Sequence, residues 1–336
     1  MDRRDFLKVA TVAPLLATVG TATDAEARHN LPPLPEGVGL LFDSNLCIGC
    51  QSCVAKCQEV NKMDLNPADS LHSKNNYLSP FTFNVIQMWE NGTGVNKDQV
   101  EDGYAYIKRQ CMHCVDPNCV SACPVSAMQK DPVTGIVTTD PSLCTGCRYC
   151  MVACPFNVPK YEYDDPFGRL QKCSLCNQKG VERIDKGGIP ACAEVCPTGA
   201  VIFGKRSDLL REARQRVAAD PGSEHNYPLK AIGSGEFNKT SVPHYNQEIY
   251  GEREGGGCQC LVLSSVPYEN LGLPTLQEES FGAATETVQH GLYRGMFLPI
   301  ALIPALLYGW LTKRTWSSLS SGKAGNKHDE KEAGNE

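Results

Sequence analysis

Short apolar stretches separated by turn residues mark the middle of this chain. Phe83 to Glu90 have the apolar content of a β-strand, and Tyr104 to Ile107 form a second short candidate strand. Asn91-Gly92 lies between them and is a turn signal. These features predict a β-hairpin in an insert over residues 63–105, with its second strand continuing to Ile107. We expect the insert to be structural rather than a docking surface for a partner.

Helical periodicity is clear at one place further along the chain. Leucine, alanine and valine residues recur at helical spacing between Asp208 and Ala219, which predicts a helix capped by Ser207. Val201 to Phe203 form a predicted strand just before it. The stretch from Asp220 to Glu286 is rich in Gly, Pro, Asn and Tyr. We therefore expect residues 206–290 to form a largely irregular extension.

A short apolar run near the N-terminus belongs to a predicted export signal. Val9 to Gly20 follow the basic motif DRRDFLK and precede Ala25-Glu26-Ala27, so the three regions of a signal peptide occur in order. We predict that residues 1–27 are removed, which leaves Arg28 at the new N-terminus. Residues 28–42 then form a linker.

A second apolar run lies near the C-terminus. The uncharged stretch from Met296 to Leu311 would rise about 24 Å as a helix, against about 30 Å for a hydrocarbon core. Addition of Arg294, which can extend toward the interface, gives a sufficient span. Basic residues follow this run, and the positive-inside tendency assigns them to the cytoplasm. We predict one transmembrane helix over 291–314 and a disordered cytoplasmic tail over 315–336. The alternative is a buried helix of a soluble domain.

Composition changes the picture through one residue type. The chain has 336 residues, a net charge of -6 and 18 cysteines. The absence of a basic surplus gives no support for nucleic-acid binding. So many cysteines indicate a disulfide scaffold, a set of metal sites, or both.

All but two of the cysteines fall into four groups, and each group begins with Cys-x2-Cys. The groups are Cys47, Cys50, Cys53 and Cys57; Cys111, Cys114, Cys119 and Cys123; Cys144, Cys147, Cys150 and Cys154; and Cys173, Cys176, Cys192 and Cys196. The third group has the C-x2-C-x2-C-x3-C-P spacing of bacterial ferredoxins. This repetition predicts several 4Fe-4S clusters, each held by four thiolates.

Structural zinc and a disulfide scaffold are the alternatives for these groups. Cys-x2-Cys pairs also bind zinc, but zinc normally takes two such pairs for each ion.

Gly49 and Gly146 lie inside two of the loops, where the backbone has to approach a cluster closely. We expect the fourth cysteine of each group to begin a helix and to ligate a neighbouring cluster.

The four groups together resemble the four-cluster ferredoxin-like electron-transfer subunits of bacterial respiratory complexes, over about residues 43–205. The segments CMHCVDPNCVSACPVSA, CTGCRYCMVACPFNVPKY and VPYENLGLP narrow the resemblance to the iron–sulfur subunits of periplasm-facing, membrane-bound nickel–iron hydrogenases. The resemblance implies an α+β fold with two ferredoxin-like units of two clusters each, nested in one domain. Residues 43–62 with 165–205 would form the outer unit, and residues 106–164 the inner unit.

The resemblance also implies which cysteines share a cluster, because the first group pairs with the fourth and the second with the third. The implied ligand sets are Cys47, Cys50, Cys53 and Cys196 (first set); Cys111, Cys114, Cys119 and Cys154 (second set); Cys144, Cys147, Cys150 and Cys123 (third set); and Cys173, Cys176, Cys192 and Cys57 (fourth set). It implies four 4Fe-4S clusters and no catalytic residue.

The implied function is electron transfer without catalysis. The partners would be the large and small subunits of a nickel–iron hydrogenase and an integral membrane, quinone-reactive subunit. Arg3-Arg4 resembles the twin-arginine signal, whose route carries folded, cofactor-loaded proteins. The cluster domain would then lie on the periplasmic side of the inner membrane. The alternatives are the equivalent subunit of a molybdenum or tungsten enzyme, such as formate dehydrogenase or a sulfur-compound reductase, and a periplasmic metal-binding scaffold without redox function.

Three further residues lie near these groups without belonging to a ligand set. Cys258 and Cys260 occur in GGGCQC, where we expect a free thiol pair or a disulfide, with an extra pair of metal ligands as the alternative. His113 lies inside the second group. Because four cysteines already serve there, we expect His113 to make a contact beside the cluster or with a partner.

Overall fold

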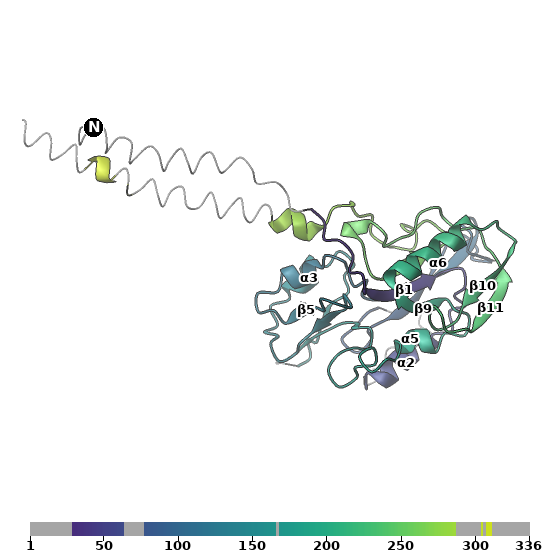
Figure 1. Cartoon of the computed structure of the whole chain (residues 1–336), viewed down its shortest axis with the longest axis horizontal. Helices are drawn as coiled ribbons and strands as arrows, with labels where there is room; N and C mark the ends of the chain where they lie inside the picture. The colour runs from purple at the N-terminus through teal and green to yellow at the C-terminus, as the bar shows by residue number, and fades with distance from the viewer. Residues whose placement is uncertain (1–28, 64–76, 166–167, 287–303, 305–306, 311–336) are drawn as a thin grey trace, which may run out of the picture. The chain divides into compact units, whose positions relative to one another are not determined.

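A computed structural model of the chain describes residues 29–63, 77–165, 168–286, 304 and 307–310 (Figure 1). The expected signal peptide and cytoplasmic tail lie outside these residues, as does most of the expected anchor. Within the described residues, the structure contains no helix that combines the length and apolar character needed to cross a membrane. Residues 29–283 form one compact unit, and this unit holds all the cysteines.

A three-stranded sheet with the order β12-β1-β9 lies at the centre of this unit. The middle strand, β1 (Val38–Asp43), runs parallel to β12 (Leu261–Leu263) and antiparallel to β9 (Val201–Lys205). Successive side chains of β1 point to opposite faces, so Leu40 packs into the core that contains the cysteines and Leu41 packs into a second core. The strand predicted at Val201 to Phe203 is confirmed.

One face of this sheet is covered by α6 (Arg206–Ala218), as Figure 1 shows. Leu209 and Ala213 of α6 are fully buried in the second core. The helix begins two residues earlier than predicted, and the prediction that Ser207 caps it is wrong. Lys205 is the residue before the first turn, and no side chain caps this end. The backbone N–H of Arg206 donates instead to the carbonyl of Gly37 at 2.7 Å, so a tertiary contact replaces the cap.

The extension after α6 is more regular than the sequence predicts. β10 (Glu224–Pro228) and β11 (Phe237–Ser241) form an antiparallel pair, and the one-turn helix η1 (Glu254–Gly256) precedes β12. The prediction of an irregular extension is therefore wrong for these segments. β12 has only three residues and exists because β1, distant in sequence, offers it hydrogen-bonding partners. No local periodicity could reveal such a strand.

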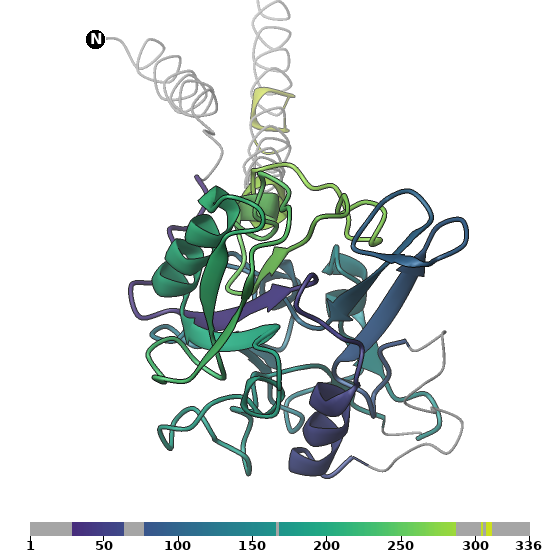
Figure 2. The ribbon, with the colours of Figure 1, turned by 90° about the vertical axis from the view of Figure 1, so that its right-hand side faces the viewer.

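The predicted hairpin of the insert is confirmed. β2 (Val85–Glu90) pairs antiparallel with β4 (Gly103–Arg109), and the two-residue β3 (Asn96–Lys97) joins the edge of β4. Figure 2 shows the hairpin in blue. It docks on the first cysteine group through hydrogen bonds from Gln51 Nε2 to the carbonyl of Ile86 at 3.0 Å and from Ser44 Oγ to the carbonyl of Tyr106 at 2.7 Å.

Short helices pair the cysteine groups. α2 (Ser52–Val60) packs against α5 (Ala191–Glu194), and α3 (Asn118–Ser121) packs against α4 (Tyr149–Ala153). Two small hairpins complete the inner unit, namely β5 (Met128–Lys130) with β6 (Val137–Thr139) and β7 (Lys160–Tyr161) with β8 (Leu170–Gln171). The mixed helix and strand content confirms the α+β class.

Candidate metal centres

The Cys-x2-Cys loops of all four groups share one backbone feature. The residue before the second cysteine has a left-handed φ in each loop, at 69° for Gly49, 47° for His113, 73° for Gly146 and 52° for Leu175. Turns of this kind direct backbone N–H groups to one side and form concave sites for anions. The N–H of Leu175 lies 3.5 Å from the Sγ of Cys173. The same loop is therefore built four times, although only two copies contain glycine.

Gly49 is confined by its neighbour as well as by its φ. A Cβ added at this position would lie 2.5 Å from ring atoms of Tyr106 on β4. Real Cβ atoms do not approach that closely, so the loop and the hairpin fit together only with glycine at this position. The backbone at Gly49 was predicted to approach a cluster closely. The structure shows that it also approaches Tyr106 closely.

All four thiols of the first set line one cavity. Cys47 and Cys50 come from the loop, Cys53 from α2, and Cys196 from the segment after α5, and apolar residues such as Ile86 close the wall. A cavity lined by four sulfur atoms is a donor set that suits iron–sulfur chemistry. Burial raises the pKa of Cys47 to about 12, the N–H of Gly49 lowers it in part, and the nearby thiols of Cys53 and Cys196 raise it further. Metal binding has to displace the protons from such thiols.

The fourth and third sets are also brought together. Burial raises the pKa of Cys57 well above its usual value, and three nearby thiols add to this shift, namely those of Cys173, Cys176 and Cys192. Burial raises the pKa of Cys150 to about 11, and again three thiols contribute, namely those of Cys123, Cys144 and Cys147. In both cases the neighbours are the other members of the expected set.

The second set forms a similar centre. Burial raises the pKa of Cys119 well above its usual value, Lys172 lowers it in part, and the thiols of Cys111, Cys114 and Cys154 raise it. The structure thus brings together all four expected sets. Among the described residues, no three His, Cys, Asp or Glu side chains converge closely enough to hold a single metal ion. A 4Fe-4S cluster carries one iron for each thiolate and so holds its ligands further apart than one ion does.

Each short helix, together with the residues just after it, contributes to two sets. Cys53 and Cys57 lie one turn apart on α2, and they belong to the first and fourth sets. The other groups repeat this arrangement, but their fourth cysteines follow α3, α4 and α5. The prediction that the fourth cysteine begins a helix is therefore wrong. Each of these helices instead begins one residue before the third cysteine of its group.

The centres follow the order first, fourth, second and third. Cys192 of the fourth set lies near Cys53 of the first set, and Cys173 of the fourth set lies near Cys111 of the second set. The contact between α3 and α4 joins the second set to the third. All thiols of the fourth set are buried, whereas Cys50 of the first set and Cys147 of the third set are exposed. Both ends of the series therefore reach the surface.

Two buried lysines lie among these thiols, and sequence analysis did not identify them. Lys108 is only 3% exposed, and its Nζ donates to Asn84 Oδ1 at 2.7 Å. Burial alone would lower the pKa of Lys108, but the nearby thiols, led by Cys192 and Cys53, raise it above its usual value. A lysine in a predicted strand gives no sequence signal of this role.

Lys108 thus lies between the first and fourth sets, and Lys172 lies in a similar way between the fourth and second sets. Its Nζ donates to the carbonyls of Val137 and Cys173, and it also lies against the thiol of Cys111. Burial raises the pKa of Cys111, and the charge of Lys172 lowers it in part. In the sequence, the position of Lys172 directly before Cys173 could have indicated that this lysine lies beside a cluster site.

His113 is fully buried beside the second set. Its Nδ1 accepts a hydrogen bond from the N–H of Val137 at 3.0 Å. Burial lowers the pKa of His113 well below its usual value, and the charge of Lys172 lowers it further, so the ring is neutral. The side chain makes a contact within the chain beside the expected cluster site, which is the first of the two expected alternatives. Cys258 and Cys260 are free thiols rather than a disulfide, and both are buried.

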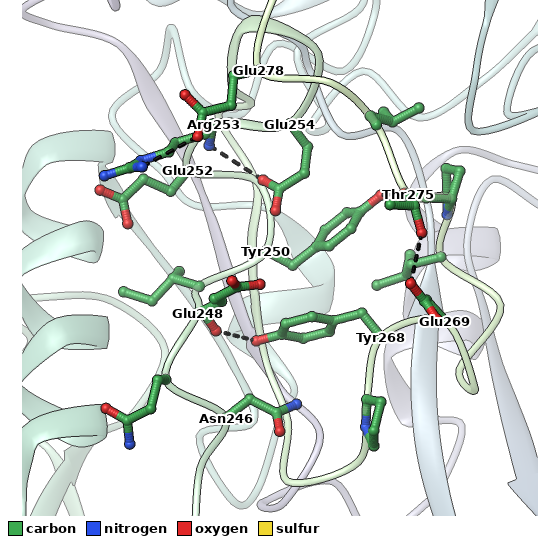
Figure 3. Close-up of a pocket in the computed structure, with 16 residues that line it drawn as sticks. Asn246, Glu248, Tyr250, Glu252, Arg253, Glu254, Tyr268, Glu269, Thr275 and Glu278 are labelled. Carbon is green, nitrogen blue, oxygen red and sulfur yellow. Dashed lines mark hydrogen bonds and ion pairs between the residues drawn. The ribbon is translucent and has the colours of Figure 1, made fainter.

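A larger cavity lies in the extension and contains no cysteine (Figure 3). The rings of Tyr250 and Tyr268 lie across it, 5.3 Å apart, and the hydroxyl of Tyr268 donates to the carbonyl of Glu248 at 2.6 Å. Tyr250 also packs edge-on against Phe156, two residues after Cys154. The wall of this cavity therefore supports the loop that follows the last thiol of the second set.

Comparison with known proteins adds a family to this geometry. Two overlapping segments, residues 46–127 and 103–206, match families described as 4Fe-4S dicluster domains. The chain is 59% identical over 307 residues to the hydrogenase-2 operon protein HybA of Escherichia coli O157:H7. The aligned residues cover 91% of this chain and 94% of that protein. The chain belongs to the HybA family. The resemblance predicted from the cysteine segments is confirmed.

More distant similarity extends beyond the HybA family. The formate dehydrogenase-O iron–sulfur subunit of Escherichia coli K12 is 32% identical over 82% of this chain and 84% of its own length. The nitrate-inducible formate dehydrogenase iron–sulfur subunit of the same organism is 35% identical over 63% of this chain and 71% of its own length. The HybA family is therefore the nearer match in both identity and coverage.

Proposed function

We propose that this chain is a non-catalytic electron-transfer subunit that relays electrons between a nickel–iron hydrogenase and a quinone-reactive membrane partner. The observation that supports this most strongly is the arrangement of four cysteine sets in series, in a chain that is 59% identical to a hydrogenase-2 operon protein. The HybA-family match favours a hydrogenase partner over the formate dehydrogenase alternative, whose subunits are only 32% to 35% identical to this chain.

The proposal assigns one 4Fe-4S cluster to each set. The ligands are Cys47, Cys50, Cys53 and Cys196; Cys111, Cys114, Cys119 and Cys154; Cys144, Cys147, Cys150 and Cys123; and Cys173, Cys176, Cys192 and Cys57. When bound, such clusters supply one-electron transfer over a wide range of potentials. The cavity of the first set and the four equivalent loops support this assignment.

The protein's own residues set the environment of these centres. Burial of the fourth set excludes water from the middle of the series. Lys108 and Lys172 place positive charge beside thiolates that would otherwise be buried without a counter-charge, and buried charges need such partners. Backbone N–H groups in the left-handed loops add donors to the sulfur atoms.

The two exposed ends are the proposed contact points for redox partners. At the first set, Ile48 is 55% exposed next to the exposed thiol of Cys50. At the third set, Tyr149 and Val152 are 62% and 88% exposed near Cys147. Apolar side chains beside an end of the series are suited to bind a partner there. One end would face the hydrogenase and the other the membrane subunit.

We further propose that the cluster domain is exported by the twin-arginine route and anchored by residues 291–314 in the inner membrane. The support is the signal sequence, the apolar run and its basic flank. Among the described residues of that run, Leu307, Tyr308 and Trp310 are exposed. Replacement of Arg3-Arg4 by two lysines is expected to leave the full-length precursor in the cytoplasm, as fractionation and immunoblotting would measure.

Iron analysis tests the cofactor assignment. The purified complex is expected to contain about sixteen irons for each copy of this chain, beyond those of its partners, and to give reducible EPR signals. Zinc in these sites without a reducible signal would support the alternative of a metal-binding scaffold.

Co-purification tests the choice of partner. The chain is expected to travel with a large subunit that contains nickel. A partner that contains molybdopterin and no nickel would contradict the hydrogenase assignment and would favour the formate dehydrogenase or reductase alternative.

A further inference from the structure

The segment GGGCQC, which the proposed function does not use, forms a tight turn toward the second set. Gly255, Gly256 and Gly257 have φ values of 60°, 86° and 86°. Residues with side chains rarely adopt this conformation, so the glycine run is required for the turn. Immediately after it, Cys258 is fully buried. The turn therefore carries a thiol from the extension into the interior of the cluster domain.

Cys258 lies directly opposite Cys114, a proposed ligand of the second set, in an antiparallel bridge. The N–H of Val115 donates to the carbonyl of Gly257 at 2.9 Å, and the N–H of Gln259 donates to the carbonyl of His113 at 3.0 Å. These bonds flank the two cysteines, which form the non-hydrogen-bonded pair between them. In such a pair the Cα atoms are about 4.5 Å apart and the side chains lie closest.

Further contacts hold Cys258 in this position. Its N–H donates to the carbonyl of Gly251 at 2.7 Å, and its carbonyl accepts from Arg206 Nε at 2.7 Å. Arg206 Nη2 also donates to the carbonyl of Glu252 at 3.0 Å, so one buried guanidinium ties both ends of the turn to the start of α6. The thiol of Cys258 is therefore fixed against Cys114 by the backbone on both sides.

The chemistry of Cys258 and Cys114 decides which thiol donates a hydrogen bond and which accepts it. The non-hydrogen-bonded pairing places the thiols of Cys258 and Cys114 side by side, within reach of a hydrogen bond between them. A thiolate that ligates iron has no proton and can only accept, whereas a free thiol carries a weak S–H donor. With a cluster in place, the hydrogen bond therefore runs from Cys258 to Cys114.

We propose that Cys258 is a positioning residue of the second set, whose S–H donates to the Sγ of Cys114 and raises the reduction potential of the cluster held there. Reduction adds negative charge to the cluster and its thiolates, and a hydrogen bond to a ligand sulfur stabilises that charge. This inference rests on the proposed function, because it requires a cluster on the second set.

Cys260 provides a matched control. It is also a buried thiol, two residues further on in the same segment. Its Sγ accepts a hydrogen bond from Gln110 Nε2 at 3.7 Å and is not paired with Cys114 in the bridge. Cys260 also lies near Cys111 of the second set, so its removal tests whether the loss of any buried thiol there shifts the potential, while the donor to Cys114 stays in place.

The test is an EPR-monitored redox titration of the complete complex, purified without oxygen, together with iron analysis. A Cys114→Ala variant, in which one ligand is removed, identifies the signal of the second set. Cys258→Ala is expected to retain the full iron content and to shift the potential of that signal to a more negative value. Cys258→Ser keeps a hydrogen-bond donor and is expected to shift it less, and Cys260→Ala is expected to leave it unchanged.

Three outcomes would overturn the inference. The first is an unchanged potential in Cys258→Ala with full iron content, and the second is an equal shift in Cys260→Ala. The third is a loss of about four irons in Cys258→Ala together with retention of all iron in Cys114→Ala, which would make Cys258 the ligand. Failure of the proposed function is distinguishable, because the unmodified chain would then lack the iron and the reducible signals.

Discussion

Gly49 shows how tightly a single residue position is specified at these centres. Its φ of 69° disfavours any side chain, and a Cβ there would lie 2.5 Å from the ring of Tyr106. The cysteine loop and the insert hairpin therefore share one constraint. A change at this residue acts on the first set without touching a ligand.

Gly49→Ala is expected to lower the iron content by about four per chain, through loss of the first cluster. The left-handed conformation costs alanine about 1–2 kcal/mol, and relief of the clash would move the loop. Gly180→Ala is the matched control, because Gly180 also has a positive φ, at 90°, but has no atom within 4 Å of an added Cβ. Iron analysis of both variants measures the effect, and equal iron content in the two would contradict it.

Lys108 is a buried charge whose nearest described electrostatic partners are thiols. Burial disfavours its charged form, while the thiols of the first and fourth sets favour it and raise its pKa overall. Asn84 accepts its hydrogen bond at 2.7 Å and fixes the ammonium in place. The positive charge of Lys108 therefore lies between the first and fourth sets and acts on both.

Lys108→Met removes this charge at nearly constant volume. We expect the potentials of the first and fourth clusters to fall by about 60 mV or more, equivalent to about 1.4 kcal/mol, because reduced clusters lose a nearby cation. EPR-monitored titration measures the shift. Lys205→Met, at a lysine that is 48% exposed and paired with Glu36 away from the thiols, is the control and should leave all potentials in place. A shift confined to the third cluster would disagree with the position of Lys108.

At the scale of elements, a buried ion pair joins α6 to the central sheet. Arg216 donates from Nη1 to Asp43 Oδ2 at 3.0 Å, and both side chains are fully buried. Tyr245 donates to the same carboxylate at 2.6 Å, and Glu212 accepts from Arg216 Nε at 2.8 Å. Asp43 ends β1, shortly before the first cysteine loop. The network thus fixes the strand from which that loop starts.

Arg216→Met is expected to lower the free energy of unfolding by about 3–5 kcal/mol, because it leaves the carboxylate of Asp43 buried without its cation. Arg211→Met on the same helix is the control. Arg211 is 64% exposed and pairs with Asp208 at the surface, so its loss should cost less than about 1 kcal/mol. Denaturant unfolding of both variants measures the difference. Similar midpoints would show that the buried pair does not stabilise the fold.

At the scale of the whole molecule, the proposed anchor and the cysteine centres lie in different parts of the chain. Residues 29–283 form a compact unit that contains every cysteine. The proposed anchor begins after it, at residue 291. Loss of the anchor should therefore change where the protein resides without changing its cofactor content.

A chain that ends after Arg294 is expected to keep about sixteen irons and to be released from membranes by high-salt washes. A chain that ends after Ser317 retains the apolar run, lacks only the distal tail, and should stay in the membrane pellet. Immunoblots of pellet and supernatant measure the distribution. Equal retention of both truncated chains would rule out residues 291–314 as the anchor.

The sequence by itself determined the chemistry of the centres. Ligand type, the Cys-x2-Cys loops and the fourfold repeat are local features, as are the β2–β4 hairpin and most of α6, because hydrophobic periodicity and loop spacing act over a few residues. The pairing of Cys53 with Cys196, by contrast, came from the family resemblance, and contact between α2 and α5 is needed to see it.

Only the tertiary structure decided what surrounds each centre. β12 has no periodicity of its own and forms because β1 offers a free edge, so the extension could not be predicted as part of the sheet. Lys108 resembles any lysine in a strand, and Cys258 is distant in sequence from Cys114. Their roles depend on burial and on contacts between remote segments, and such contacts are established only when the chain folds.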